Sequence, residues 1–429
     1  MRTQIEEAAR GRITSAMRSA AASENVPAEK VRLEVASGRA VIPANPLHKG
    51  LKPAVVGRAF RTKINANIGC SATASDRTKE LEKLRVALDA GADCVMDLSV
   101  GTGLVRMRKA MLAACPVALG TVPIYEAVAR VRGDATKLDG DILLAVIEDH
   151  ARQGVDFMTL HSGLLQSHVP IAVKRIMGIV SRGGAILAEW MVCHRKENPL
   201  YTRWDEVMDI CHRYDVTVSL GDGLRPGCLA DASDKAQFAE LSVLGKLVRR
   251  CRARGVQVMV EGPGHVPFNQ IEMNMKREEN VCHGAPFYVL GPVVTDIAPG
   301  YDHITSCIGA TAAAYHGAAL LCYVTAAEHL ALPTADEVRG GIVAYRIAAH
   351  AADVARGLPG ARDADDAMAR ARMDFNWERQ FELAIDGKHA RARFMKTMTA
   401  RDKNTDHCSM CGKDFCAVRR TKRLHEASH

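Results

Sequence analysis

The sequence lacks long hydrophobic runs. Its longest apolar stretches, such as AILAEWMV, are far shorter than the roughly 20 residues that a membrane-spanning helix needs. The first residues, MRTQIEEAARGRITSAM, contain no apolar segment of the kind that opens a secretory signal. We therefore expect a cytoplasmic protein without a membrane anchor.

Aromatic residues are also scarce, at 5% of 429 residues. The 57 Lys and Arg residues are spread along the chain, and no stripe of interleaved basic and aromatic residues is present. This pattern argues against nucleic acid as a partner. The net charge of +8 still favours an anionic partner, and a phosphorylated small molecule suits it better.

A disulfide framework is missing as well. The 13 cysteines are odd in number, and apart from three near the C-terminus they are scattered singly. Such a distribution suits a reducing compartment.

The middle of the chain alternates short apolar or β-branched runs with segments of helical periodicity, for example at residues 77–92 and 235–255. Eight strand–helix units over about 240 residues predict an α/β fold, a TIM-type (β/α)8 barrel. An open doubly wound sheet is the alternative, but no G-x-G-x-x-G follows the first run. The eight runs lie at residues 61–69, 94–101, 116–125, 157–163, 176–184, 216–223, 256–265 and 287–294.

The sequence predicts four parts. Residues 1–55 form a small N-terminal α+β domain, and residues 56–300 form the catalytic barrel. Residues 301–397 are Ala-rich and predict a helical C-terminal domain. Residues 398–429 are polar and basic and predict a flexible tail that carries cysteines.

In such a barrel the carboxyl ends of the strands converge on one cavity. Any single polar residue there could be a turn or cap residue, but all eight runs end in residues whose side chains can bind a ligand or transfer a proton. The set therefore indicates an active site. It consists of Asn67, Met96, Asp97, Tyr125, His161, Ser181, Arg182, Gly183, Asp222, Arg225, Glu261, His265 and Tyr288.

Two of the run ends suit an anion. SRGG at residues 181–184 and DGLRPG at residues 222–227 each combine an arginine with a glycine turn, which is suited to phosphate. A plain glycine turn with a solvated arginine is the alternative for each motif taken alone.

Two histidines are candidate metal ligands. EGPGH places Glu261 and His265 four residues apart, and His265 could act as a general base or bind a metal. With His329 in AAEHLALP it would form an open zinc-type site, although either could be a hydrogen-bonded structural histidine. In GYDHITS, Asp302 or His303 could serve the site or cap a helix.

The tail reads DHCSMCGKDFC at residues 406–416, and its cysteines are spaced C-x2-C-x4-C. Cys408, Cys411 and Cys416 could hold an iron–sulfur cluster that keeps one iron open, with Gly412 easing the turn. A zinc knuckle with His407 as fourth ligand is the alternative.

From about residue 55 to residue 418 the chain resembles the phosphomethylpyrimidine synthases of thiamine biosynthesis, which are noncanonical radical S-adenosylmethionine enzymes. Cys70 after NANIG and the segment LHSG around His161 depart from the residues usual in that family. The resemblance rests on NANIG, VMDLS, GTVPIYEA, GIVSRGG, HRKENPLYT, SLGDGLRPG, EGPGHVP, CHGAPFYVLGP, TDIAPGYDHITS, LCYVTAAEHLALP, RIAAHAAD and the cysteine tail.

This resemblance implies a radical lyase that converts 5-aminoimidazole ribotide to 4-amino-5-hydroxymethyl-2-methylpyrimidine phosphate, with formate and CO released. It implies S-adenosylmethionine, a 4Fe-4S cluster on Cys408, Cys411 and Cys416, and a divalent metal, with zinc expected, on His265 and His329. We expect Glu261, His161 and Tyr288 to be catalytic. The substrate-binding residues implied are Asn67, Met96, Tyr125, His161, Ser181, Arg182, Gly183, Asp222, Gly223, Leu224, Arg225, Glu261 and Tyr288.

The resemblance also implies a homodimer in which one chain's tail reaches its partner's barrel, and a low-potential electron donor of the flavodoxin or ferredoxin type. One alternative is a related synthase that makes 5-hydroxybenzimidazole from the same ribotide for anaerobic cobalamin biosynthesis. The intact SRGG and DGLRPG favour the thiamine branch. A zinc-knuckle binding protein is the second alternative, and the equipped strand ends argue against it.

Overall fold

The computed structural model describes residues 2–71, 76–396, 398 and 405–427. Its internal contacts divide the chain into two compact units, residues 1–353 and 354–429. The predicted domain boundaries at residues 55 and 397 stay predictions, and residue 397 itself lies outside the described residues. Within the described residues, no helix combines the length and apolar character that crossing a membrane requires.

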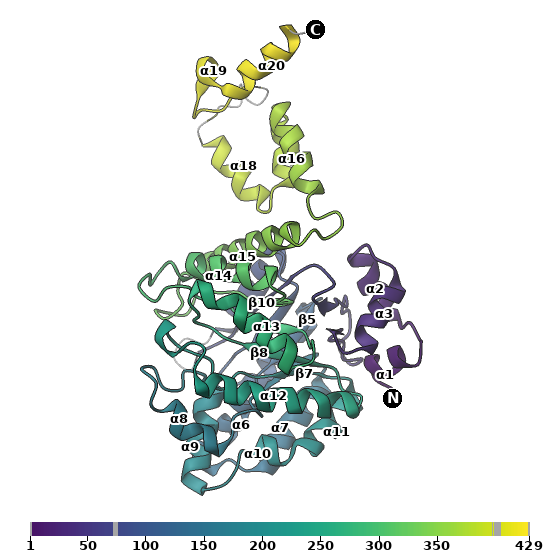
Figure 1. Cartoon of the computed structure of the whole chain (residues 1–429), viewed down its shortest axis with the longest axis vertical. Coiled ribbons are helices and arrows are strands. Elements are labelled where there is room, and N and C mark those ends of the chain that lie inside the picture. The colour runs from purple at the N-terminus through teal and green to yellow at the C-terminus, as the bar shows by residue number, and fades with distance from the viewer. Residues whose placement is uncertain (1, 72–75, 397, 399–404, 428–429) are drawn as a thin grey trace. The chain divides into compact units, whose positions relative to one another are not determined.

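A closed barrel of eight parallel strands forms the centre of the first unit (Figure 1). Most strand residues are buried on both faces, as is usual for parallel sheets covered by helices. The strands confirm the predicted (β/α)8 barrel. They are β3 (Lys63–Ile68), β4 (Cys94–Asp97), β5 (Ala118–Thr121), β6 (Phe157–Leu160), β7 (Thr217–Leu220), β8 (Val258–Gly262), β9 (Phe287–Leu290) and β10 (Leu320–Cys322).

One of the eight predicted strands is wrong. Residues 176–180 form no strand, and Ser181 caps the helix that begins at Arg182. The eighth strand is β10, which pairs with both β9 and β3 and so closes the barrel. Its three residues are too short to stand out in an Ala-rich segment. The barrel consequently ends at Cys322, beyond residue 300, where the sequence places its boundary.

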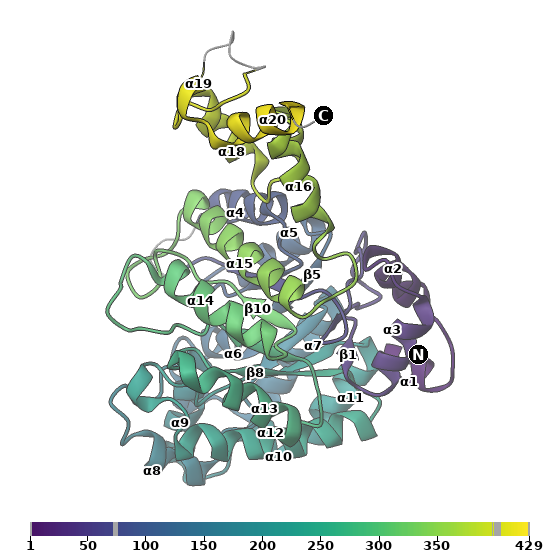
Figure 2. The ribbon, with the colours of Figure 1, turned by 45° about the horizontal axis from the view of Figure 1, so that its top comes forward.

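Helices cover the outside of the barrel (Figure 2). Two predicted helices are confirmed as α4 and α12. Asp76 caps α4 by accepting hydrogen bonds from Thr78 and Lys79, and Gly91 ends it with φ at 96°. The helices are α4 (Arg77–Ala90), α5 (Leu104–Ala114), α6 (Pro123–Arg130), α7 (Gly140–Gln153), α8 (Val169–Ala172), α9 (Arg182–His194), α10 (Pro199–Thr202), α11 (Trp204–Tyr214), α12 (Lys235–Ala253), α13 (Ile271–Val281), α14 (Asp302–Tyr315) and α15 (Ala335–Ala355), with short 3-10 turns at Ala135–Lys137, Gln166–His168, Leu229–Asp231 and Phe268–Gln270.

The N-terminal segment has its own apolar cluster, in which Met17, Val31, Val35 and Ile42 are fully buried or nearly so. Its strands β1 and β2 pair in antiparallel fashion. The elements are α1 (Gln4–Ala9), α2 (Ser15–Ser23), α3 (Ala28–Ala36), β1 (Ala40–Val41) and β2 (Val56–Gly57).

The second unit is helical and carries the cysteine tail. Trp377 and Phe394 stack with ring centroids 4.6 Å apart, and Phe381 packs on Phe394 at 5.6 Å, which joins α17 to α18. The helices of this part are α16 (Asp363–Met373), α17 (Trp377–Leu383), α18 (Gly387–Met395), α19 (Gly412–Phe415) and α20 (Ala417–Ala427).

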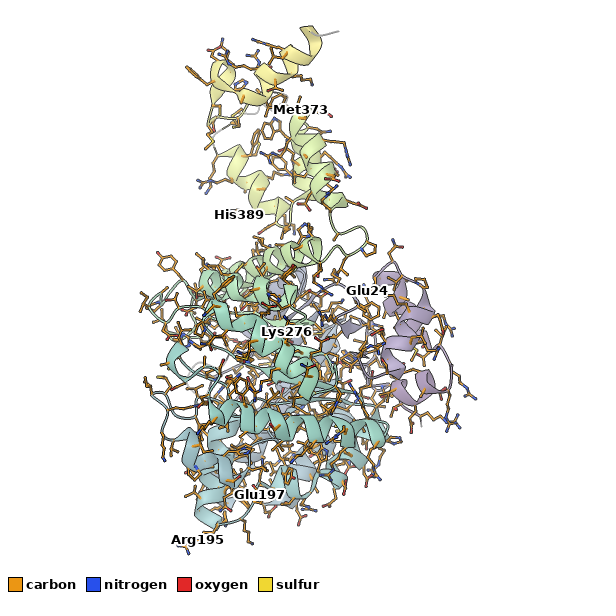
Figure 3. All side chains as sticks on the ribbon, viewed as in Figure 1. Glu24, Arg195, Glu197, Lys276, Met373 and His389 are labelled. Atoms are coloured by element: carbon orange, nitrogen blue, oxygen red, sulfur yellow. The ribbon has the colours of Figure 1, made fainter. Side chains whose placement is uncertain are left out.

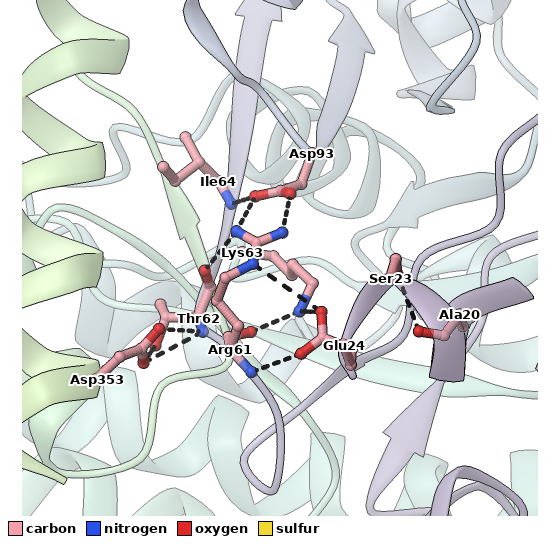
Figure 4. Close-up of polar contacts among 9 residues, drawn as sticks. All are labelled: Ala20, Ser23, Glu24, Arg61, Thr62, Lys63, Ile64, Asp93 and Asp353. Carbon is pink, nitrogen blue, oxygen red and sulfur yellow. Dashed lines mark hydrogen bonds and ion pairs between the residues drawn. The ribbon is translucent and has the colours of Figure 1, made fainter. Parts of the chain in front are cut away.

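A buried ion pair ties the N-terminal segment to the barrel. Glu24, labelled in Figure 3, lies at the end of α2. Its Oε1 is 2.8 Å from Nζ of Lys63 at the start of β3, and the two side chains are only 4% and 1% exposed. Burial lowers the pKa of Lys63, and the charge of Glu24 opposes that shift. On the other side of the same strand, Asp353 of α15 accepts hydrogen bonds from the N–H and hydroxyl of Thr62 (Figure 4).

We expect Glu24→Ala to destabilise the first unit by about 3–5 kcal/mol, because it leaves a buried ammonium group without its partner. The measurement is urea unfolding followed by circular dichroism. The double variant Glu24→Leu/Lys63→Met should recover most of the loss, since both charges are removed together.

The control is Asp205→Ala, which breaks an ion pair with Arg250 in which Asp205 is 75% exposed. Such exposed pairs contribute at most about 1 kcal/mol. A Glu24→Ala variant no less stable than Asp205→Ala would contradict the anchoring role.

Candidate active site

A cavity that is open to solvent lies at the carboxyl ends of the barrel strands. Polar residues from most of the strand ends face it, as expected for the catalytic end of such a barrel. The predicted site residues that line it are Asn67, Met96, Tyr125, His161, Arg182, Asp222, Arg225, Glu261 and Tyr288.

The remaining predicted substrate residues do not line this cavity but support it. The hydroxyl of Ser181 accepts a hydrogen bond from the N–H of Gly184 and caps α9. The N–H of Leu224 donates to the carboxyl of Glu240, so this amide is not free for a ligand. Gly183 lies against the ring of His161, where an added Cβ would overlap the imidazole. Gly223 also lies behind the wall.

Two arginines reach the cavity, one from the start of helix α9 and one from the loop after β7. Arg182, at the start of α9, lies over the ring of Tyr125 at 4.8 Å from its centroid. Arg225, in the loop after β7, places Nη1 3.1 Å from Oδ1 of Asp222. The first turn of α9 packs directly against the loop after β7. An added Cβ at Gly184 would overlap the carbonyl oxygen of Gly223. Their contact brings two guanidinium groups to one wall, which suits an anion.

Two acidic side chains face the same cavity. Glu261 accepts hydrogen bonds from the hydroxyls of Thr159 at 2.6 Å and Ser219 at 2.8 Å. Burial raises the pKa of Glu261, and these two bonds oppose the shift. Burial likewise raises the pKa of Asp222, against the charge of Arg225. Carboxyl groups shifted towards neutrality can exchange protons with a ligand.

His161 is buried on the cavity wall. Burial lowers its pKa to about 3, and the charge of Arg225 acts in the same direction. The imidazole is therefore neutral, and its Nδ1 has no hydrogen-bond partner among the residues that the structure describes. A neutral ring with an unused nitrogen can form a hydrogen bond with a ligand.

The opposite wall contains a hydrogen-bond network across the seam of the barrel. Asn65 donates to the hydroxyl of Tyr288 at 2.7 Å and to Oδ1 of Asn67 at 2.8 Å. Asn67 in turn donates to Sγ of Cys322 at 2.9 Å. Sequence reasoning missed Cys322 because it missed β10, although the apolar run LLCYV that precedes a polar segment is a signal for that strand.

Asp97 is buried but does not line the cavity. Its Oδ1 accepts a hydrogen bond from the N–H of Ser99 at 2.9 Å, which fixes the turn after β4. Its role is thus to shape the rim.

The structure brings the two candidate metal ligands together. His265 follows β8 and His329 follows β10, and their ring centroids lie 5.2 Å apart. Among the described residues, no group of three or more His, Cys, Asp or Glu side chains is arranged to hold a metal ion. The pair fits a divalent metal with two nitrogen ligands and open positions, a donor set that imidazole-binding metals accept.

The three tail cysteines are free thiols at and before the two ends of the short helix α19. The N–H of Gly412 donates to the carbonyl of Cys408, and Gly412 has φ at 62°, a conformation that favours glycine. Cys411 and Cys416 flank the short helix α19. Three thiols are the donor set that an open iron–sulfur cluster requires, but within the described part of the chain these three are not gathered around a metal position.

A second open cavity adjoins the first and shares part of its lining. The half-buried side chain of Glu328 and the ion-paired Lys83 face this second cavity. The residues that line both cavities are Asn67, Leu98, Arg182, Arg225 and Leu290.

Comparison with known proteins identifies the family. A sequence profile described as the radical SAM ThiC family matches residues 3–423. The chain belongs to this family. It is 58% identical over 420 residues to the phosphomethylpyrimidine synthase of Halobacterium salinarum, covering 98% of this chain and 88% of the relative. It is also 58% identical over 428 residues to the enzyme of the same name from Natronomonas pharaonis, covering all of this chain and 90% of the relative.

The chain also resembles solved structures of dihydropteroate synthases. A dihydropteroate synthase from Coxiella burnetii aligns with a TM-score of 0.40 at 14% identity, covering 68% of this chain and 94% of that one. A dihydropteroate synthase from Yersinia pestis aligns with a TM-score of 0.39. At these values the likeness carries no argument about the site.

We expect Gly184→Ala to destabilise the protein by about 1–3 kcal/mol, because the added Cβ overlaps a backbone oxygen that cannot rotate away. Gly340→Ala is the matched control, since an added Cβ in α15 meets no atom within 4 Å. It should be neutral or stabilise by up to about 1 kcal/mol. The measurement is the urea concentration at the unfolding midpoint of each variant. Equal midpoints would refute the contact between the start of α9 and the loop after β7.

Proposed function

We propose that this chain is a phosphomethylpyrimidine synthase that acts in thiamine biosynthesis. It would convert 5-aminoimidazole ribotide to 4-amino-5-hydroxymethyl-2-methylpyrimidine phosphate with release of formate and CO. Relatives of that name, 58% identical along nearly the whole chain, support the activity. The observation that carries the substrate class is the pair of arginines on one wall of the barrel cavity.

In this proposal Arg182 and Arg225 hold the phosphate of the ribotide. Their guanidinium groups come from the start of α9 and from the loop after β7, which pack against each other, so a single anion can bind both. The ring of Tyr125 stacks against the guanidinium group of Arg182, and the carboxyl group of Asp222 orients Arg225. Because burial disfavours the charged form of Asp222, the wall keeps its positive character.

The reacting end of the substrate would lie against Glu261, His161 and Tyr288. Neutral His161 offers a nitrogen that is not used within the described residues. Glu261, whose pKa burial raises, can hold a proton or release it while Thr159 and Ser219 keep its carboxyl in place. Asn65 fixes the hydroxyl of Tyr288. These residues can orient the ring and move protons during the rearrangement.

We propose S-adenosylmethionine as the occupant of the second cavity, which shares a wall with the first. A 4Fe-4S cluster on Cys408, Cys411 and Cys416 would supply the electron that cleaves this co-substrate to a 5′-deoxyadenosyl radical. The chain itself contributes three free thiols around α19 and the second cavity, whose walls would limit side reactions once the cavity is filled.

The remaining parts of the proposal concern partners. We propose a divalent metal, zinc, at His265 and His329, and a flavodoxin or ferredoxin as electron donor. We also propose a cytoplasmic homodimer in which the tail of one protomer serves its partner. A 5-hydroxybenzimidazole synthase and a zinc-knuckle binding protein are the alternatives that the following experiments separate.

Anaerobic turnover of the reconstituted enzyme with 5-aminoimidazole ribotide, S-adenosylmethionine and dithionite should yield hydroxymethylpyrimidine phosphate, detected by mass spectrometry. Hydroxybenzimidazole in its place would refute the thiamine assignment. Deoxyadenosine without either product would refute the substrate while leaving the cluster in place.

Cys411→Ala should abolish cleavage of S-adenosylmethionine, since two thiolates cannot hold the cluster, and should leave urea unfolding of the barrel unit unchanged. Cys193→Ala is the matched control, because Cys193 is an exposed cysteine on α9 and is not part of the tail motif. It should retain full deoxyadenosine production. A Cys411→Ala variant with normal cleavage, or reconstituted protein that binds zinc but no iron, would contradict the cluster assignment.

A further inference from the structure

Each of the two histidines of the proposed metal site has a carboxylate behind it. Nδ1 of His265 lies 2.8 Å from Oδ1 of Asp296, and Nδ1 of His329 lies 3.3 Å from Oδ1 of Asp302. Asp296 lies in the loop after β9, and Asp302 is the first residue of α14. The four side chains therefore come from the carboxyl ends of three neighbouring strands.

A carboxylate next to Nδ1 fixes the tautomer of an imidazole. It accepts the Nδ1 proton, so the lone pair remains on Nε2 and the ring cannot flip without losing the bond. Among the described residues, neither Nε2 has a hydrogen-bond partner of its own. In both rings Nδ1 is therefore hydrogen-bonded to a carboxylate, while Nε2 is available as a metal ligand.

The carboxylate of Asp296 makes a second hydrogen bond, and that of Asp302 is buried. Oδ2 of Asp296 accepts a hydrogen bond from the N–H of Leu229 at 2.9 Å, so this residue links His265 to the loop that carries Arg225. Asp302 is 5% exposed, and its Oδ2 is buried without a hydrogen-bond partner among the described residues.

Stability alone does not account for this arrangement. The side chain of His329 is 48% exposed, so its pairing with Asp302 contributes little to folding. His329 also has φ at 63°, a left-handed conformation that costs a residue with a Cβ about 1–3 kcal/mol. Residues that keep such strain are concentrated at functional sites.

We infer that Asp296 and Asp302 are positioning residues that hold His265 and His329 as Nε2 ligands for one divalent metal ion. The inference rests on the metal site proposed above. It adds Asp296, which no sequence motif assigned to that site, and for Asp302 it chooses service to the site over the helix-cap role that the motif left open.

The test is the affinity of the full-length protein for Co2+, followed by absorbance and by equilibrium dialysis against a chelator. Cys408, Cys411 and Cys416 are replaced by serine in every sample, because thiolates bind the same metal. We expect Asp296→Ala and Asp302→Ala each to weaken Co2+ binding about 10- to 100-fold. The Asn variants should lose less, since an amide oxygen still accepts the Nδ1 proton without a charge.

Asp141→Ala is the control, because Asp141 is 86% exposed and pairs with Arg203 on the outer helices. It should leave Co2+ binding unchanged. A double-mutant cycle separates positioning from general structure. Asp302→Ala should have no further effect when His329 is already alanine, whereas Asp296→Ala should keep its effect in that background.

The outcomes distinguish the two levels of the proposal. If His265→Ala and His329→Ala leave Co2+ binding unchanged, the metal site is refuted and this inference with it. If the histidine variants lose the metal but the Asp→Ala variants do not, only the positioning role is refuted. If an alanine variant fails to fold, the isosteric Asn variant of the same residue is measured in its place. Unchanged Co2+ binding in the Asn variant, together with no coupling between the two residues in the double-mutant cycle, overturns the inference.

Discussion

The closure of the barrel by β10 is the constraint on which the rest of the structure depends. This strand has only three residues, and it pairs Leu320 with Lys63 on β3 and with Tyr288 on β9. Because all strands are parallel, the same closure determines both rims. At the carboxyl rim it brings Asn67 to Cys322, and at the amino rim it places Lys63 beside Glu24. Site chemistry and the anchoring ion pair therefore lie at opposite ends of one seam.

Burial gives the cavity its electrostatic character. Arg182 and Arg225 face it together with Asp222 and Glu261, so a simple count of charges gives no net attraction for an anion. Burial raises the pKa of both carboxyl groups, which weakens their negative charge while the guanidinium groups stay charged. Glu240 behind the loop follows the same rule, since burial raises its pKa to about 8, and it holds Leu224 without adding a full negative charge. This distribution of charge supports the proposal of an anionic ligand.

Much of the barrel and its rim could be predicted from the sequence, because parallel strands buried on both faces appear as apolar runs that end abruptly in polar residues. The run at 176–184 has the same appearance, yet it leads into α9 and contributes Arg182 from a helix start. Arg182 lines the barrel cavity although it comes from a helix and not from a strand end. Strand β10 was missed because the run LLCYV that contains it is short and follows an Ala-rich segment.

The supporting residues could not be found from spacing, because they act across elements. Asp296 lies 31 positions from His265, Asp302 lies 27 from His329, and Glu240 lies 16 from Leu224. In each case a residue at a strand end is held by a carboxyl group from an adjacent part of the barrel. A motif such as EGPGH records the group that faces the ligand and omits the group that orients it. The geometry of the rim is consequently a property of neighbouring strand–helix units taken together, and closure of the barrel is what makes them neighbours.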